Sequence, residues 1–119
     1  MLDVRSATFG IRTGDLAGAR VWYERILGRP PDLVPADGVY EWRLAPGAWL
    51  QLIAGEPAEP GIGQIARLGV AEIGAARAAL EAAGARAGEV TTIPDVVAIC
   101  DVEDPFGNAL SIYEDLTGD

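Results

Sequence analysis

The amino-acid sequence contains no histidine, the residue that most often serves as a general base or a metal ligand. Without histidine neither a Ser-His-Asp nor a Cys-His arrangement can form, so hydrolysis of those types is excluded. The single cysteine, Cys100, lies in an apolar run and predicts a small buried side chain rather than a disulfide or a zinc site. Acid–base chemistry in this chain would therefore depend on carboxylates and tyrosines.

Three acidic residues, Asp101, Glu103 and Asp104, lie close together near the C-terminus. The last of them opens the segment 104–108, which reads Asp-Pro-Phe-Gly-Asn. Proline presets φ for a turn, and glycine accepts the positive φ that a tight reversal needs. We therefore predict a turn that leads into a final strand over 109–114, with Asp104 serving the turn and Glu103 solvated.

Length, composition and charge limit the possible classes of protein. The chain has 119 residues, half of them apolar, and a net charge of −9. These values predict one domain with a real core, and they argue against nucleic acid and anionic membranes as partners. No membrane span or signal-peptide pattern is found, so a soluble cytoplasmic protein is expected. All basic residues are arginine, which with the abundant alanine and glycine indicates a GC-rich bacterial genome.

The elements that must position these residues repeat along the chain. The first half predicts strands over 4–13, 39–44 and 48–54, a helix over 15–27, and a poorly determined piece around 33–34. The second half predicts strands over 64–70, 86–92, 96–103 and 109–114 and a helix over 72–83. Leu-Ala-Gly-Ala-Arg at 16–20 aligns with Ile-Gly-Ala-Ala-Arg at 73–77, an offset of 57 residues (73 − 16). Two βαβββ units are predicted, 1–55 and 64–119, joined by a linker over 56–63.

Several motifs together resemble the vicinal oxygen chelate superfamily. They are Asp-Leu at 15–16, Trp-Tyr-Glu-Arg-Ile-Leu-Gly at 22–28, Ala-Ala-Gly at 82–84 and the turn segment at 104–108. That group includes glyoxalase I, extradiol dioxygenases, fosfomycin-resistance transferases and bleomycin-resistance proteins. The resemblance covers essentially the whole chain and implies one α+β domain, in which a curved mixed sheet encloses a ligand cavity and the helices lie outside. It does not specify an activity, because one fold hosts many functions.

Metal-dependent members of that superfamily hold a divalent ion through four side chains, one near each of four strand centres. The resemblance places these positions at Thr8, Gln51, Ile65 and Ser111. A catalytic divalent ion needs imidazole, thiolate or carboxylate donors, and this set offers two hydroxyls, an amide and an isobutyl group. We therefore expect no metal and no other cofactor, as in the metal-free members of the superfamily.

Strand alternation predicts which further residues share a face with those four positions. They are Arg12, Tyr40, Trp42, Trp49, Arg67, Ile99, Asp101 and Tyr113. The pattern does not fix the register of the strand that carries Tyr40 and Trp42. Tryptophan and tyrosine suit planar or cationic ligands, whereas the alternative for each aromatic is a place in the core. Arg67 and Asp101 can pair with each other or hold opposite ends of a ligand.

Three functions are compatible with this site. The first is a metal-independent protein of the bleomycin-resistance type that sequesters an aromatic or cationic natural product such as an antibiotic. The second is a metal-independent lyase, isomerase or cyclase of secondary metabolism, with Asp101, Tyr113 or Tyr40 as the acid or base. The third is an interaction module without a small-molecule ligand. A homodimer is expected in each case, because family members of this size usually pair.

Overall fold

The structure is a computed structural model that describes residues 1, 3–56 and 65–118. The chain divides into two compact units, Met1–Pro57 and Ala58–Asp119, and each is described by itself. Apart from Glu56, the predicted linker lies outside the described residues. No helix in the described part of the chain is long and apolar enough to cross a membrane.

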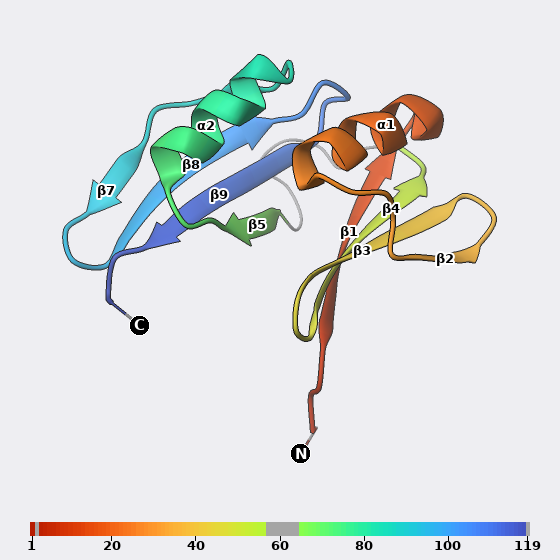
Figure 1. The fold of residues 1–119 in the computed structure, drawn as a ribbon, viewed down its shortest axis with the longest axis horizontal. Helices are drawn as coiled ribbons and strands as arrows, with labels where there is room; N and C mark the ends of the chain where they lie inside the picture. Colours follow the sequence, from red (N-terminus) through yellow and green to blue (C-terminus); the bar gives the residue numbers. More distant parts are fainter. Residues whose placement is uncertain (2, 57–64, 119) are drawn as a thin grey trace. The chain divides into compact units, whose positions relative to one another are not determined.

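Unit one has the predicted βαβββ order. Its elements are β1 (Ala7–Thr13), α1 (Leu16–Leu27), β2 (Leu33–Ala36), β3 (Val39–Ala45) and β4 (Ala48–Ala54). They form a four-stranded sheet in the order β1-β4-β3-β2, in which β1 runs parallel to β4 and the other pairs are antiparallel. Figure 1 shows α1 crossing one face of this sheet. The predicted α+β class and the hairpin between β3 and β4 are confirmed.

Unit two repeats the plan with one strand divided. Its elements are β5 (Ala66–Gly69), α2 (Ile73–Ala82), β6 (Arg86–Ala87), β7 (Thr91–Ile93), β8 (Val97–Glu103) and β9 (Ala109–Asp115). The sheet has the order β5-β9-β8-β6, and β7 also pairs with β8 (Figure 1). The prediction of one continuous strand over 86–92 is wrong. Ala87 pairs with Val102 and Thr91 with Ile99, so the segment from 87 to 91 is one residue longer than the segment of β8 that it pairs with. The chain therefore bulges between β6 and β7.

The two helices begin at equivalent places and are capped by the same kind of bond. Helix α1 begins at Leu16 and α2 at Ile73, which confirms the offset of 57 residues (73 − 16). The Asp15 carboxylate accepts a hydrogen bond from the Gly18 backbone N–H at 3.0 Å, and Glu72 accepts two from the first turn of α2. An aspartate N-cap stabilises a helix by about 1 kcal/mol. These bonds fix where each helix starts above its sheet.

Each helix buries the apolar side chains of one sheet face. In unit one the buried set is Ile11, Ala19, Trp22, Tyr23, Trp42, Leu50 and Leu52. In unit two it is Ala66, Ile73, Leu80, Ala85, Ala98, Cys100, Val102, Leu110 and Ile112. Cys100 is therefore the small buried side chain that the sequence predicts. No described helix of either unit covers the opposite face of its sheet, and we call that face the open face.

Two carboxyl groups in the described part of the chain have a lowered pKa, and both stabilise chain connections. The pKa of Asp32 is lowered mainly by the hydrogen bond that its carboxylate accepts from the Arg43 backbone N–H at 2.7 Å, with help from Arg29. The pKa of Asp115 is lowered by the hydroxyl and backbone N–H of Thr117, which both donate to its Oδ1. Asp32 thereby ties the segment after α1 to β3, and Asp115 ends β9.

Candidate functional site

The open face of unit one presents three rows of side chains that run across β1, β4 and β3. Residues paired across a sheet point to the same side, so the strand register defines the rows. They are Thr8–Trp49–Arg43, Gly10–Gln51–Glu41 and Arg12–Ile53–Val39. Four predicted site residues, Thr8, Arg12, Trp49 and Gln51, therefore share this face. Trp49 and Gln51 are half-buried, and Thr8 and Arg12 are exposed.

The predicted face of Tyr40 and Trp42 is wrong. Their register partners are Leu52 and Leu50, which lie on the helix side of the sheet. Trp42 is fully buried, and its indole N–H donates to the Arg29 carbonyl at 3.0 Å. Both aromatics therefore belong to the packing of α1 against β3, and neither lies on the face that carries Trp49.

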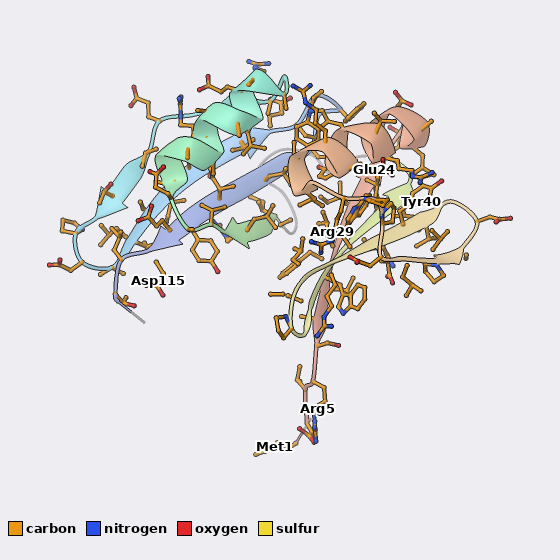
Figure 2. The ribbon with its side chains drawn as sticks, viewed as in Figure 1. Met1, Arg5, Glu24, Arg29, Tyr40 and Asp115 are labelled. Carbon is orange, nitrogen blue, oxygen red and sulfur yellow. The ribbon has the colours of Figure 1, made fainter. Side chains whose placement is uncertain are left out.

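Contacts with α1 hold these two aromatic rings. The Trp42 ring lies 6.4 Å from that of Tyr23. The Arg20 guanidinium lies 4.8 Å from the centre of the Tyr40 ring and pairs with Glu24, which Figure 2 labels beside Tyr40. A cation over a ring face is an attractive contact, so Tyr40 has a structural partner on the helix.

On β3, Glu41 and Arg43 point to the open face, where strand alternation had predicted Tyr40 and Trp42. Glu41 Oε2 accepts a hydrogen bond from Gln51 Nε2 at 2.9 Å, and both side chains are half-buried. Glu41 is not among the site residues that the sequence predicts. The available signal was the alternation of Val39, Glu41 and Arg43 with Tyr40 and Trp42, because the charged set suits the face without a helix.

The open face of unit two presents an equivalent arrangement on β5, β9 and β8. Its rows are Arg67–Ser111–Asp101 and Gly69–Tyr113–Ile99. Arg67 Nη1 donates to Ser111 Oγ at 3.3 Å, and Ser111 is fully buried. Arg67 forms no ion pair with Asp101 among the described residues, so the first of the two alternatives for these side chains, direct pairing, is not observed.

Tyr113 and Ile99 extend this face toward the end of β9. The Tyr113 ring lies across β5 against Gly69, where an added Cβ would come within 3.0 Å of the ring. Glycine at this position therefore makes room for the ring. Tyr113 is 37% exposed, Ile99 is half-buried and Asp101 is exposed. Ile65 precedes β5 instead of lying within it, and it is half-buried.

The donor set at the four family positions does not fit a divalent ion. Ile65 has no donor atom. The Gln51 amide is engaged with Glu41, and Ser111 lies beside the positive guanidinium of Arg67, which would repel a cation. Among the described residues no group of three or more histidine, cysteine or acidic side chains is arranged to hold a metal. Glu41 lies beside Gln51 in unit one, and the exposed Asp101 lies opposite Ser111 in unit two. In either unit, one carboxylate with neutral oxygens is a poor site for a transition metal.

Comparison with known proteins identifies the family. The model of the Glyoxalase/Bleomycin resistance protein/Dioxygenase superfamily matches residues 5–112. No curated protein sequence matches the chain.

Solved structures share the fold at low sequence identity. A glyoxalase/bleomycin resistance protein from Catenulispora acidiphila is 24% identical, with a TM-score of 0.69 over 92% of this chain and 96% of that one. A family enzyme from Burkholderia phytofirmans is 15% identical, with a TM-score of 0.74 over 97% and 100% of the two chains. TnmS3, an antibiotic binding protein from a Streptomyces species, is 20% identical, with a TM-score of 0.73 over 97% and 98%. At these identities the likeness shows the fold alone.

Proposed function

The chain belongs to the Glyoxalase/Bleomycin resistance protein/Dioxygenase superfamily, and from that premise we propose that it binds and sequesters a small molecule without a metal. The ligand class that we propose is an aromatic or cationic natural product, such as an antibiotic. TnmS3, which shares the fold, is described as an antibiotic binding protein. Fold alone does not establish function, so the proposal depends on the side chains of the open faces.

One observation carries the proposal. At two of the family's metal positions the side chains are already engaged with charged neighbours, Gln51 with Glu41 and Ser111 with Arg67. These contacts favour recognition by hydrogen bonds over coordination of a metal. The polar groups lie on the same face as a large aromatic side chain in each unit, Trp49 in unit one and Tyr113 in unit two. Aromatic side chains beside a few oriented polar groups are typical of the residues that line small-molecule sites.

Charge supports a cationic ligand. The chain has 18 acidic and 9 basic residues, so its field attracts cations over the range of the Debye length. A cationic group that approaches Trp49 would also gain from the negative face of the indole ring.

Trp49 allows a direct test of ligand binding. Trp22 and Trp42 are buried on the helix side, whereas Trp49 is half-buried on the open face. A bound flat ligand should therefore quench mainly Trp49 fluorescence in a screen of antibiotics and aromatic metabolites. Trp49→Ala is expected to weaken the binding of a hit by about 1–3 kcal/mol and to lower the melting temperature less than truncation of a buried tryptophan does.

The matched control is Trp22→Phe on the buried side of α1. This variant should lower the melting temperature and leave the affinity for the same compound unchanged. If Trp49→Ala lowers the melting temperature as much as Trp22→Phe and keeps the affinity, Trp49 is a packing residue and the proposal loses its main contact. A screen with no binding compound would count against sequestration.

A metal-independent lyase, isomerase or cyclase remains the second candidate. Asp101 and Tyr113 lie on the same face of neighbouring strands in diagonal positions, so both could reach one ligand. Asp101 is exposed, however, whereas a carboxyl group that acts as an acid or base at neutral pH is usually buried. A change in the mass of a bound compound on incubation would favour this second function.

We also propose that the protein is a homodimer. Strand β2 lies at the edge of the sheet of unit one, and all four of its residues are exposed, with Leu33 at 48% and Val34 at 53%. Natural proteins usually cover or disrupt such an edge, and a second copy of the chain is one way to cover it. Light scattering at micromolar concentration should give twice the mass of the 12.5 kDa chain. A monomer at that concentration would contradict this proposal.

A further inference from the structure

One row on the open face of each unit occupies an equivalent place, but the two rows differ in composition. In unit one the row is Gly10–Gln51–Glu41, and in unit two it is Arg67–Ser111–Asp101. Gly10 and Arg67 are related by the same offset as the two helices, 57 residues (67 − 10). Each row therefore carries an uncharged hydrogen-bonding residue on the central strand and a carboxylate on the next. Only unit two carries a cation on the first strand of its row.

The direction of the Gln51 amide follows from its partner. A carboxylate only accepts hydrogen bonds, so the amide nitrogen of Gln51 must face Glu41, and Oε1 must point away from it. Gln51 Oε1 is 4.0 Å from the position that a Cβ at Gly10 would take. No donor reaches this oxygen within the described parts of the chain, and it is not sealed from solvent. An accessible acceptor is thus directed at the place where Gly10 has no side chain.

In unit two the equivalent place is filled by a cation. The Arg67 side chain starts from the position that corresponds to Gly10, and its guanidinium donates to Ser111 on the central strand. Unit two therefore shows that a cationic donor fits this position of the βαβββ unit. In unit one no side chain starts from Gly10, but the acceptor, Gln51 Oε1, is present.

We propose that the space over Gly10 binds the cationic donor group of a ligand, such as an amidinium, guanidinium or ammonium, through Gln51 Oε1. This inference rests on the proposed function and specifies which part of the ligand binds where. Trp49 lies two residues from Gln51 on the same face of β4, about 7 Å along the strand, so it can contact a ring attached to the cationic group. The Glu41 carboxylate, hydrogen-bonded to Gln51, supplies the compensating negative charge.

The other charged side chains on this face do not occupy that place. The stem of Arg12 lies against Gly55, where an added Cβ would be 3.1 Å from Arg12 Cδ. Arg43 lies in the neighbouring row, opposite Trp49, and is exposed. Neither arginine is within ion-pair distance of Glu41 among the described residues, so the negative charge of Glu41 is available to a ligand.

Three planar probes with the same ring separate the charge requirement from the shape requirement. Benzamidinium is a cation that only donates, benzamide is neutral and both donates and accepts, and benzoate is an anion that only accepts. Titration of the full chain, followed by tryptophan fluorescence and ligand-observed NMR, should give affinities in the order benzamidinium, benzamide, benzoate. A hydrogen bond to a charged group predicts at least about a tenfold preference for benzamidinium over benzamide.

Gly10→Arg tests the location of the site. The new guanidinium would fill the place as Arg67 does in unit two, and benzamidinium affinity should fall at least about tenfold. The backbone at Gly10 has no positive φ and a Cβ there meets nothing closer than 4.0 Å, so the fold should accept the change. Val21→Arg is the matched control, because it adds the same charge on α1 at a residue that is 67% exposed, and it should leave the affinity unchanged.

The outcomes distinguish this inference from the proposed function. Benzoate binding as tightly as benzamidinium, or a Gly10→Arg protein that keeps full benzamidinium affinity, would overturn the inference and leave small-molecule binding in place. Failure of all three probes to bind would overturn the inference and count against the binding function as well. If Gly10→Arg does not fold, Gln51→Leu removes the acceptor instead, and a preference for benzamidinium that survives this change would overturn the inference.

Discussion

Replacing Trp42 with alanine is expected to lower the free energy of unfolding of unit one by about 3–5 kcal/mol. The Trp42 side chain is fully buried between β3 and α1, where its ring contacts Tyr23 and its indole N–H donates to the Arg29 carbonyl. Truncation removes this packing and leaves a cavity that the surrounding strands and helix can fill only in part. Urea denaturation followed by circular dichroism measures the change.

Two further variants serve as comparisons. One separates the contribution of the hydrogen bond from that of ring packing, and the other compares the two faces of the sheet. Trp42→Phe keeps most of the ring packing and loses the bond to Arg29, so it should cost about 1–3 kcal/mol. Trp49→Ala removes a half-buried ring from the opposite face of the same sheet and should cost about 1–2 kcal/mol. If Trp42→Ala and Trp49→Ala destabilise the protein equally, the assignment of the two tryptophans to different faces is wrong.

Local signals in the sequence predict the elements well, because each depends on residues within one turn. Asp15 and Glu72 precede helices that begin at the next residue, and Gly28 ends α1 with a φ of 78°. The internal repeat also survives, since the first residues of both helices keep the predicted offset. These features depend on capping and backbone freedom, which a single sequence displays directly.

Strand alternation alone does not fix the face of β3, because that face also depends on pairing with β4. In the segment Val-Tyr-Glu-Trp-Arg-Leu over 39–44, one alternation buries the aromatics and the other exposes them. The register shifts between Arg43 and Ala45, close to the turn that joins the two strands. A shift of one residue turns every side chain to the other face, so the choice follows from turn geometry and from the helix above.

The candidate site was predicted only in part for the same reason. Thr8, Trp49 and Gln51 lie on one face as expected, because β1 and β4 have clear alternation. Glu41 is identified as a site residue only from the register of β3 with β4. Its hydrogen bond sets the direction of the Gln51 amide, so the chemistry of the open face depends on a residue that strand pattern alone had placed on the wrong side.

Asp104→Ala is expected to destabilise unit two by about 3 kcal/mol, because this carboxylate organises the turn between β8 and β9. Asp104 is 3% exposed, and its Oδ1 accepts hydrogen bonds from the backbone N–H groups of Phe106 and Asn108 at 2.9 and 2.8 Å. Its Oδ2 accepts one from Asn108 Nδ2 at 2.9 Å. Alanine would leave these donors without their acceptor, and the buried amide of Asn108 is the most costly of them. Gly107, with a φ of 87°, cannot compensate, since it only provides the backbone reversal.

The neighbouring acid Glu103 provides the matched control. Its side chain is 46% exposed, and its nearest cation is Arg86 at 3.9 Å, so Glu103→Ala should change the free energy of unfolding by less than about 0.5 kcal/mol. Asp104→Asn keeps one acceptor oxygen but turns an N–H group toward another donor, so an intermediate loss of about 1–2 kcal/mol is expected. Denaturant titration of the three variants gives the ranking, and hydrogen exchange at Phe106 and Asn108 reports the turn itself. Equal stability of Asp104→Ala and Glu103→Ala would mean that the turn is maintained by Pro105 and Gly107 without the carboxylate.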